Sequence, residues 1–215
     1  INAYCKIGDM RSALMVRSKM LGAGLKPDSF TFKALIHGYC KVKDVNGAKD
    51  ILFEMLAAGL SPSYCMFSWL VDFYCNQDDE KAIIKLPDEL SERGLCVDIS
   101  VYRALIRRLC KREKVDCAEK VFITMNEKGI SGDSVVYTSL AYAYLKEGNM
   151  VAFSSLSHEM YRRRLMVTLK IYKSFSDSFA NDGSCLNTFW DNLVHRGLIS
   201  KTTQIHIQEL KINEG

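Results

Sequence analysis

Apolar residues recur along the chain at steps of three and four, the spacing that places side chains on one face of an α-helix. Within residues 29–63, one such set comprises Phe32, Leu35, Ile36, Tyr39 and Cys40. After a polar break, a second set comprises Ala48, Ile51, Leu52 and Met55. Gly59 follows, and glycine readily takes the left-handed conformation in which many helices end. Pro62 then blocks any continuation. The pattern predicts two consecutive helices.

The same pattern returns every 35 residues. An aromatic column comprises Phe32, Phe67, Tyr102, Tyr137 and Tyr172. A second column comprises Met20, Met55, Leu90, Met125 and Met160, and a glycine column comprises Gly24, Gly59, Gly94 and Gly129. One helix pair is too small to bury its own apolar face, so neighbouring pairs must stack into a continuous core. The sequence therefore predicts an all-α fold, a right-handed α-solenoid superhelix of antiparallel helix pairs with a concave inner surface.

The period divides the chain into an array over residues 1–198. Its units are the partial repeat 1–28, the complete repeats 29–63, 64–98, 99–133 and 134–168, and the degenerate repeat 169–198. The last unit is expected to be shortened, because Gly197 comes two residues before the period requires. Residues 199–215 are predicted to form a capping helix and tail. Pro87 lies in a second helix, where we expect a kink or an early end.

Two families of helical hairpins have repeats of about this length. The tetratricopeptide repeat has a 34-residue period and usually binds peptides. The segments DSFTFKALIHGYCKVKDVNGAKDILFEMLAAGLSP (28–62) and VYRALIRRLCKREKVDCAEKVFITMNEKGI (101–130) instead resemble the pentatricopeptide repeat. They carry its aromatic-x-x-Leu-Ile opening, its Cys-Lys ending of the first helix and its Met-x-x-x-Gly-Leu/Ile exit. The resemblance, closest to the P-class, implies binding of single-stranded RNA at one base per repeat.

The resemblance also assigns the residues that would read bases, namely the residue after the opening aromatic and the last residue of the same unit. These pairs are Lys33/Ser63, Ser68/Asp98, Arg103/Asp133 and Thr138/Thr168, and Asp28 ends the partial unit. Ser68/Asp98 matches a combination that the family associates with guanine, whereas Thr138/Thr168 lacks the usual Asp or Asn. Lys33 and Arg103 are cations that could grip phosphate instead. The alternative is that these repeats are degenerate and read no base.

Stacking and phosphate contacts are implied at two further columns. The second residue of each unit would stack on bases, with Phe30, Cys65 and Val135 as the candidates; Ser100 and Lys170 do not suit this role. The end of the first helix carries Lys6, Lys41, Lys111 and Lys146, which the family would use for phosphate. A lysine near a helix C-terminus also interacts favourably with the helix dipole, whatever the function.

Composition permits a nucleic-acid partner without demanding one. The chain has a net charge of +4 and a pI of about 8.6. Residues 64–98 are acidic and residues 99–133 are basic. Acidic side chains repel RNA phosphates, so this distribution fits an RNA-binding surface only if those side chains lie at the outer turn between the two helices. No apolar run approaches the roughly 20 residues that cross a bilayer, so no membrane partner is expected.

Catalytic and metal-binding motifs are not found in the sequence. Four of the eight cysteines lie one repeat apart, beyond disulfide reach, so they are expected to pack as small apolar side chains. The sequence has no C-x-x-C, no paired histidines at zinc spacing, no phosphate-binding glycine loop, no G-x-S-x-G motif and no deaminase signature. We therefore expect no enzyme, no metal and no cofactor.

Taken with the resemblance, these features predict a sequence-selective single-stranded RNA-binding protein acting in organellar RNA processing, stability or translation. The expected location is the mitochondrion, with the chloroplast as the alternative, and other partners would be organellar RNA-processing or ribosomal proteins. The competing hypothesis is a protein-interaction or ribosome-associated scaffold that reads no bases. Ile1 lies inside an expected helix, so we expect the natural protein to extend further on its N-terminal side, where any targeting peptide would lie.

Overall fold

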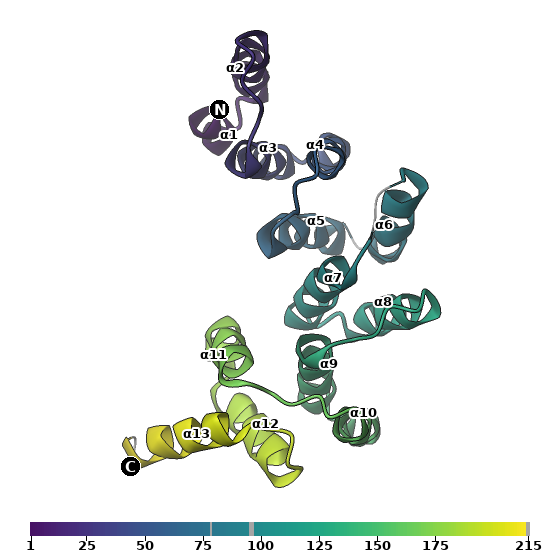
Figure 1. Cartoon of the computed structure of the whole chain (residues 1–215), viewed down its shortest axis with the longest axis vertical. Coiled ribbons are helices and arrows are strands. Elements are labelled where there is room, and N and C mark those ends of the chain that lie inside the picture. The colour runs from purple at the N-terminus through teal and green to yellow at the C-terminus, as the bar shows by residue number, and fades with distance from the viewer. Residues whose placement is uncertain (78, 95–96, 214–215) are drawn as a thin grey trace. The chain divides into compact units, whose positions relative to one another are not determined.

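The computed structural model describes residues 1–77, 79–94 and 97–213, and within these ranges the chain is built from α-helices (Figure 1). The helices are α1 Asn2–Ile7, α2 Met10–Gly22, α3 Ser29–Lys41, α4 Val45–Ala57, α5 Tyr64–Asn76, α6 Glu80–Glu92, α7 Ile99–Lys111, α8 Val115–Glu127, α9 Ser134–Lys146, α10 Met150–Arg162, α11 Leu169–Ser178, α12 Gly183–His195 and α13 Lys201–Asn213. The predicted all-α repeat of helix pairs is confirmed. None of the described helices is both long and apolar enough to span a bilayer.

Helix starts keep the 35-residue register. The first helices of the pairs begin at residues 29, 64, 99, 134 and 169, and the second helices at residues 10, 45, 80, 115 and 150. The last pair departs from this register because α11 has only ten residues and is followed by a short 3₁₀ turn, Ala180–Asp182. As a result α12 begins at residue 183, two residues early, and Gly197 follows it with the same two-residue offset.

The second helices begin at a recurring side-chain cap. Asp9, Asp44, Asp79 and Asn149 each accept a hydrogen bond from the backbone N–H three residues further on. Such caps satisfy N–H groups that have no partner within the helix. Lys114 holds the equivalent place before α8 and makes no capping bond, because an ammonium group has no acceptor.

The exits of the second helices explain the glycine column. After α4, Gly59 has φ +75° and its N–H binds the Leu56 carbonyl, while the Leu60 N–H binds the Met55 carbonyl. This pair of bonds is the Schellman ending. Arg164 occupies the equivalent place after α10 with φ +55°, a conformation that costs a non-glycine residue free energy. The early end expected at Pro87 is wrong, since α6 continues through that residue to Glu92.

The helices form two compact units, Ile1–Leu105 (unit 1) and Ile106–Gly215 (unit 2). In unit 1, α3 packs against α1 and α5, the first helices of the neighbouring pairs, and also against α4, the second helix of its own pair (Figure 1). The periodic columns supply the cores of both units: Phe32, Phe67, Tyr102 and Tyr137 are buried, as are Met55, Leu90, Met125 and Met160. Tyr172, the last member of the aromatic column, is only half-buried and packs on Trp190 and His206.

Candidate nucleic-acid interface

Unit 1 carries a hollow of about 480 Å³ on the side of its first helices. We call this side, which bears Phe30, Lys33 and Trp69, the first-helix face. Three of the predicted site residues, Asp28, Phe30 and Lys33, line the hollow together. His37 and Trp69 complete the wall. The structure therefore brings a predicted stacking residue and two predicted reading residues to one place.

Helical spacing explains why these side chains converge. Phe30, Lys33 and His37 are three and four residues apart on α3, so they share one side of that helix. Trp69 projects from α5 towards them, and its ring lies 4.6 Å from the His37 ring with an interplanar angle of 44°. Sequence reasoning missed both residues of this ring pair. Following the spacing of Phe30 and Lys33 one step further along α3 would have found His37.

Phe30 is the most exposed aromatic residue of this face. It is 80% exposed, whereas Phe32, Phe53 and Phe67 of the same unit are buried. A phenylalanine at such a position gains nothing from core packing, whereas a flat apolar surface open to solvent suits the stacking of a base. The other stacking candidates, Cys65 and Val135, are half-buried.

Predicted reading aspartates also serve as helix caps. Asp28 accepts hydrogen bonds from the Thr31 hydroxyl at 2.7 Å and the Thr31 N–H at 2.8 Å, and these bonds lower the pKa of its carboxyl. Asp133 accepts from two backbone N–H groups, of Val135 at 3.1 Å and Val136 at 3.0 Å. Asp98 accepts from the N–H of Ser100 at 2.9 Å. Ser63 and Thr168 precede first helices without a side-chain capping bond.

The two predicted reading hydroxyls are turned into their own helices. Ser68 is 6% exposed and donates to the Tyr64 carbonyl at 3.0 Å, and Thr138 is fully buried and donates to the Ser134 carbonyl at 2.5 Å. Neither hydroxyl is presented at the surface. Lys33 is exposed, while Arg103 is half-buried with its Nε atom enclosed.

The lysine column divides between the two units. In unit 1, Lys6 and Lys41 are exposed at the ends of α1 and α3, and the Lys41 ammonium donates to the carbonyl of Lys6. In unit 2, Lys146 lies 2.9 Å from Glu113 and 3.1 Å from Asp182, and the Glu113 hydrogen bond is the main cause of its raised pKa. Lys111 lies 6.0 Å from the centre of the Phe179 ring.

In unit 2, α11 and the following 3₁₀ turn pack against the equivalent face of the first helices. Arg107 of α7 donates to the Ser174 carbonyl at 2.7 Å and to the Ser178 hydroxyl at 2.5 Å. The Tyr142 hydroxyl donates to Asp182 at 2.6 Å. Beneath these bonds lies an aromatic cluster of Tyr142, Phe175, Phe179, Phe189 and Trp190. Two of the predicted phosphate lysines therefore already contact groups within unit 2.

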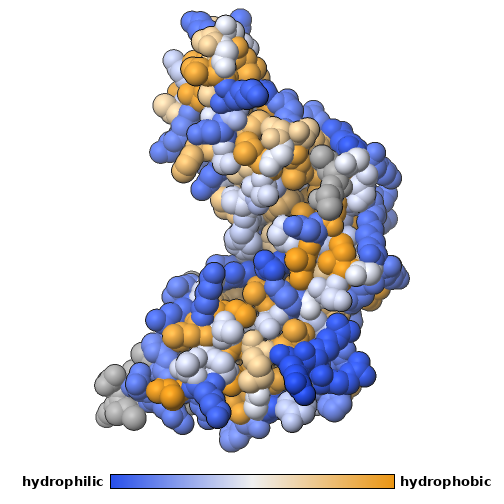
Figure 2. Space-filling model, viewed as in Figure 1, coloured by the Kyte–Doolittle hydropathy of each residue, from blue (hydrophilic) through white to orange (hydrophobic). Residues whose placement is uncertain are grey.

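Acidic residues of unit 1 lie mainly on its second helices. Glu89 of α6 binds Lys49 of α4 at 2.6 Å, and Asp50 of α4 lies 3.5 Å from Arg93. Asp79 caps α6, and Asp78 lies outside the described residues. Figure 2 agrees with this placement, since hydrophilic surface covers α6 while apolar patches are interleaved over α3 and α5. The acidic character of residues 64–98 therefore falls mostly away from the first-helix face.

The described cysteines and histidines give no sign of a metal centre. Cys5, Cys75 and Cys110 of the cysteine column are buried, and burial raises the pKa of the Cys110 thiol. Within the described residues, no three side chains of His, Cys, Asp or Glu gather closely enough to hold an ion.

Known proteins with this architecture share its repeat. The family profile described as PPR repeat family matches residues 1–41 and 97–146, and the profile described as PPR repeat matches residues 30–60. No curated protein matches the sequence significantly. The crystal structure of the pentatricopeptide repeat protein PPR10 from maize is similar, with a TM-score of 0.52 and 19% identity over 90% of this chain.

Two further structures resemble the chain. PPR10 in complex with an 18-nt psaJ RNA element has a TM-score of 0.51 and 19% identity, and the match covers 87% of this chain. The PPR domain of Arabidopsis thaliana protein-only RNase P 1 in complex with tRNA has a TM-score of 0.47 and 14% identity, covering 82% of this chain and 93% of that domain. The chain spans only 28% of the length of PPR10. Given the profile matches, which together extend over about half of its length, the chain belongs to the pentatricopeptide repeat family.

Proposed function

We propose that the chain binds single-stranded RNA on the first-helix face of unit 1. The observation that carries the proposal is the convergence of Phe30, Lys33 and the His37–Trp69 ring pair on one hollow. Single-stranded nucleic acid is bound by aromatic surfaces on which bases stack and by cations that follow the phosphates. Both kinds of group are present here within a few residues of each other. Membership of the family supports the same conclusion, as does the RNA bound by PPR10.

In this proposal a base stacks on the exposed Phe30 ring and against the Trp69–His37 pair. Lys33 lies in the same hollow, and Lys6 and Lys41 lie at the helix ends of the same unit. Asp28 continues to cap α3 through Oδ1, which leaves its second carboxylate oxygen able to accept from a base. Base contacts are thus assigned to residues that the fold leaves exposed.

Unit 2 contributes less to RNA binding in this proposal. Lys146 would have to give up Glu113 and Asp182 to bind phosphate, and Lys111 faces the Phe179 ring. An organellar location, mitochondrial or chloroplast, and a role in the processing, stability or translation of a transcript are part of the proposal through family membership alone.

The test is the salt dependence of binding to labelled single-stranded RNA, measured by fluorescence anisotropy. Each phosphate contact contributes about 0.7 to the slope of log K against log salt for single strands. We expect Lys33→Ala to weaken binding and to reduce that slope by about 0.7. Lys81→Ala, which removes an equal charge from the second helix α6, is the matched control and should change neither.

A second variant pair tests stacking. Stacking on an aromatic side chain contributes about 1–3 kcal/mol per base, so Phe30→Ala should weaken binding at least about five-fold. Ile123→Ala, at another exposed apolar residue on the second helix α8, should have no effect. Negligible binding of the wild-type chain to every oligoribonucleotide pool would refute the proposal.

A further inference from the structure

We propose that unit 2 binds a nucleoside monophosphate in a hollow on its second helices, where Arg196 holds the phosphate. The hollow has a volume of about 560 Å³ and lies where α10 meets the end of α12. That volume is within the range of about 300–1,000 Å³ in which small-ligand sites fall. The site shares no residue with the hollow proposed to bind RNA in unit 1, and it does not depend on that proposal.

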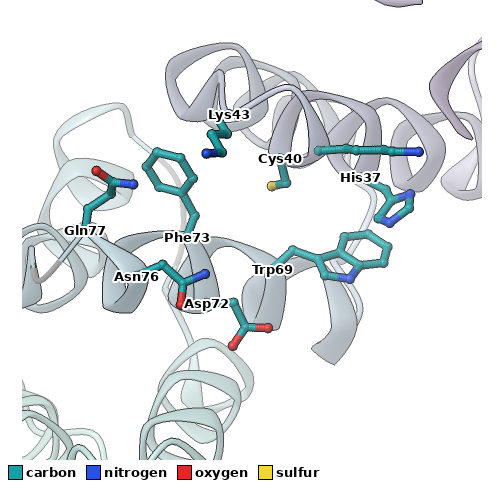
Figure 3. Close-up of a pocket in the computed structure, with 9 residues that line it drawn as sticks. His37, Cys40, Lys43, Trp69, Asp72, Phe73, Asn76 and Gln77 are labelled. Atoms are coloured by element: carbon teal, nitrogen blue, oxygen red, sulfur yellow. The ribbon is translucent and has the colours of Figure 1, made fainter. Parts of the chain in front are cut away.

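Side chains that can donate hydrogen bonds line this hollow. They are Ser154, Ser155, Ser157, His158 and Tyr161 of α10, together with Arg196 at the end of α12. Ser154, His158 and Tyr161 are four and three residues apart, so they share one side of α10. No carboxylate of the described residues lines the hollow, whereas the hollow between α3 and α5 in unit 1 has Asp72 in its lining (Figure 3). The lining in unit 2 therefore favours an anion.

Arg196 is held in place by contacts that leave its charge unpaired. Its guanidinium carbon lies 5.0 Å from the centre of the buried Phe153 ring, a cation–π contact. One guanidinium nitrogen donates to the Ser154 hydroxyl at 3.4 Å. Within the described part of the chain these are the contacts of the guanidinium, and neither involves a carboxylate. Because a guanidinium has five N–H donors, most of them remain available to a ligand.

This arrangement of donors suits a phosphate group. Arginine binds phosphate through two parallel N–H···O bonds, and such charge-assisted bonds are about twice as strong as neutral ones. The exposed side chains of Ser154, Ser155 and His158 supply further donors around the same hollow. The Ser157 hydroxyl is not among them, because it is buried and donates to the Phe153 carbonyl at 2.7 Å. A phosphate monoester has three terminal oxygens and can accept from several of these groups at once.

Tyr161 indicates what the phosphate is attached to. Its side chain borders the hollow, is 65% exposed and lies three residues beyond His158 on α10. An aromatic surface that is open to solvent suits the stacking of a nucleobase. An arginine that can hold phosphate and a ring that can hold a base thus border one hollow, and they match the two ends of a nucleoside monophosphate.

The experiment titrates the full chain with AMP and, separately, with inorganic phosphate at constant ionic strength. Backbone amide signals are followed by two-dimensional ¹H–¹⁵N NMR, which measures weak affinities and locates the ligand. Wild type should bind both ligands, with the largest signal changes at residues 154–161 and at Arg196. Because base stacking adds to phosphate binding, AMP should bind at least about five-fold more tightly than inorganic phosphate.

The phosphate contact is tested by substitution of Arg196. Arg196→Gln should weaken both ligands by at least about ten-fold, since it removes a charge-assisted bond. Lys120→Gln, which removes an equal charge from the second helix α8 of the same unit, is the matched control and should change neither affinity. Because Arg196 also packs on Phe153, Ser154→Ala provides a second test at an exposed position and should weaken both ligands about three-fold. Circular dichroism of each variant checks that the fold is intact.

The base contact is tested by two aromatic variants. Tyr161→Ala should reduce the affinity for AMP to about that for inorganic phosphate and leave phosphate binding unchanged. Phe30→Ala, in the hollow of unit 1, should leave AMP binding unchanged.

The outcomes separate this inference from the proposed function. Loss of both ligands in Arg196→Gln, together with loss of the preference for AMP in Tyr161→Ala, supports it. Three results would each overturn it: AMP binding no tighter than phosphate, equal losses in Arg196→Gln and Lys120→Gln, or loss of AMP binding in Phe30→Ala. RNA binding, measured in parallel by anisotropy, should persist in Arg196→Gln, so either proposal can fail without the other.

Discussion

The clearest quantitative prediction concerns Lys114, which breaks the capping pattern of the second helices. Four of the five equivalent positions carry Asp or Asn and cap the following helix, and Lys114 does not. The equivalent N–H belongs to Cys117, three residues further on. Lys114→Asp should therefore stabilise unit 2 by creating the cap that the other second helices have.

The magnitude follows from two contributions. Relative to alanine, an Asp or Asn cap contributes about 1 kcal/mol. A negative charge at a helix N-terminus adds about 0.3–1 kcal/mol, and repulsion from the neighbouring Glu113 and Asp116 removes a few tenths. We expect Lys114→Asp to exceed Lys114→Ala by about 1–1.5 kcal/mol in free energy of unfolding. Using alanine as the reference removes the effect of the contacts that Lys114 itself makes.

The assay is urea unfolding followed by the fluorescence of Trp190. The chain has two tryptophans, and Trp69→Phe leaves Trp190, which is buried in unit 2, as the only reporter. Lys114→Asn separates the two contributions, since it caps without adding negative charge and should gain about 1 kcal/mol. Equal stability of the Ala, Asn and Asp variants would refute the reasoning.

Three further predictions follow from other positions. Arg164→Gly should stabilise unit 2 by about 0.5–1 kcal/mol in the same urea assay, because glycine relieves the positive φ, whereas Arg164→Ala should not. Asp182→Ala should destabilise unit 2 by about 1–3 kcal/mol, because it leaves the buried Tyr142 hydroxyl without this acceptor. The hydrogen bond from Tyr142, followed by Lys146, lowers the pKa of the Asp182 carboxyl. The stability that the ionised carboxylate contributes is therefore present above about pH 4 and is lost as the pH falls through the lowered folded-state pKa. In acid titrations of unfolding, wild type and Asp182→Asn should converge once this carboxyl is protonated. Asp133→Asn should keep the cap of α9 and stay within about 0.5 kcal/mol of wild type, whereas Asp133→Ala should lose about 1 kcal/mol.

The fold was predictable because each buried position recurs. Phe32, Phe67, Tyr102 and Tyr137 are buried at one place in four consecutive units, so their common chemistry reveals the helix face that they occupy. Pro87 shows the limit of local rules. A proline in a helix interior predicts a break, but α6 passes through it, since Leu86 and Leu90 on either side are buried in the core.

The contacts of α11 were not predictable from the period. Arg107 binds Ser174 and Ser178, which lie 67 and 71 residues further along the chain, about two periods away. A repeat pattern places each unit beside its immediate neighbours and contains no information about a shortened terminal helix that reaches further. The pairing of Lys146 with Asp182 has the same origin, because Asp182 lies in the 3₁₀ turn that replaces the missing end of α11.

The site residues differ in how far the fold itself explains them. Asp28 and Asp133 cap helices, so an aspartate would be favoured there even in a repeat that binds nothing. Ser68 and Thr138 are likewise satisfied inside their helices. The side chains of Phe30 and Lys33 are exposed and take no part in a helix cap or in the buried core. The evidence for function therefore lies in the residues that the fold does not require, and these are the ones that gather around Trp69.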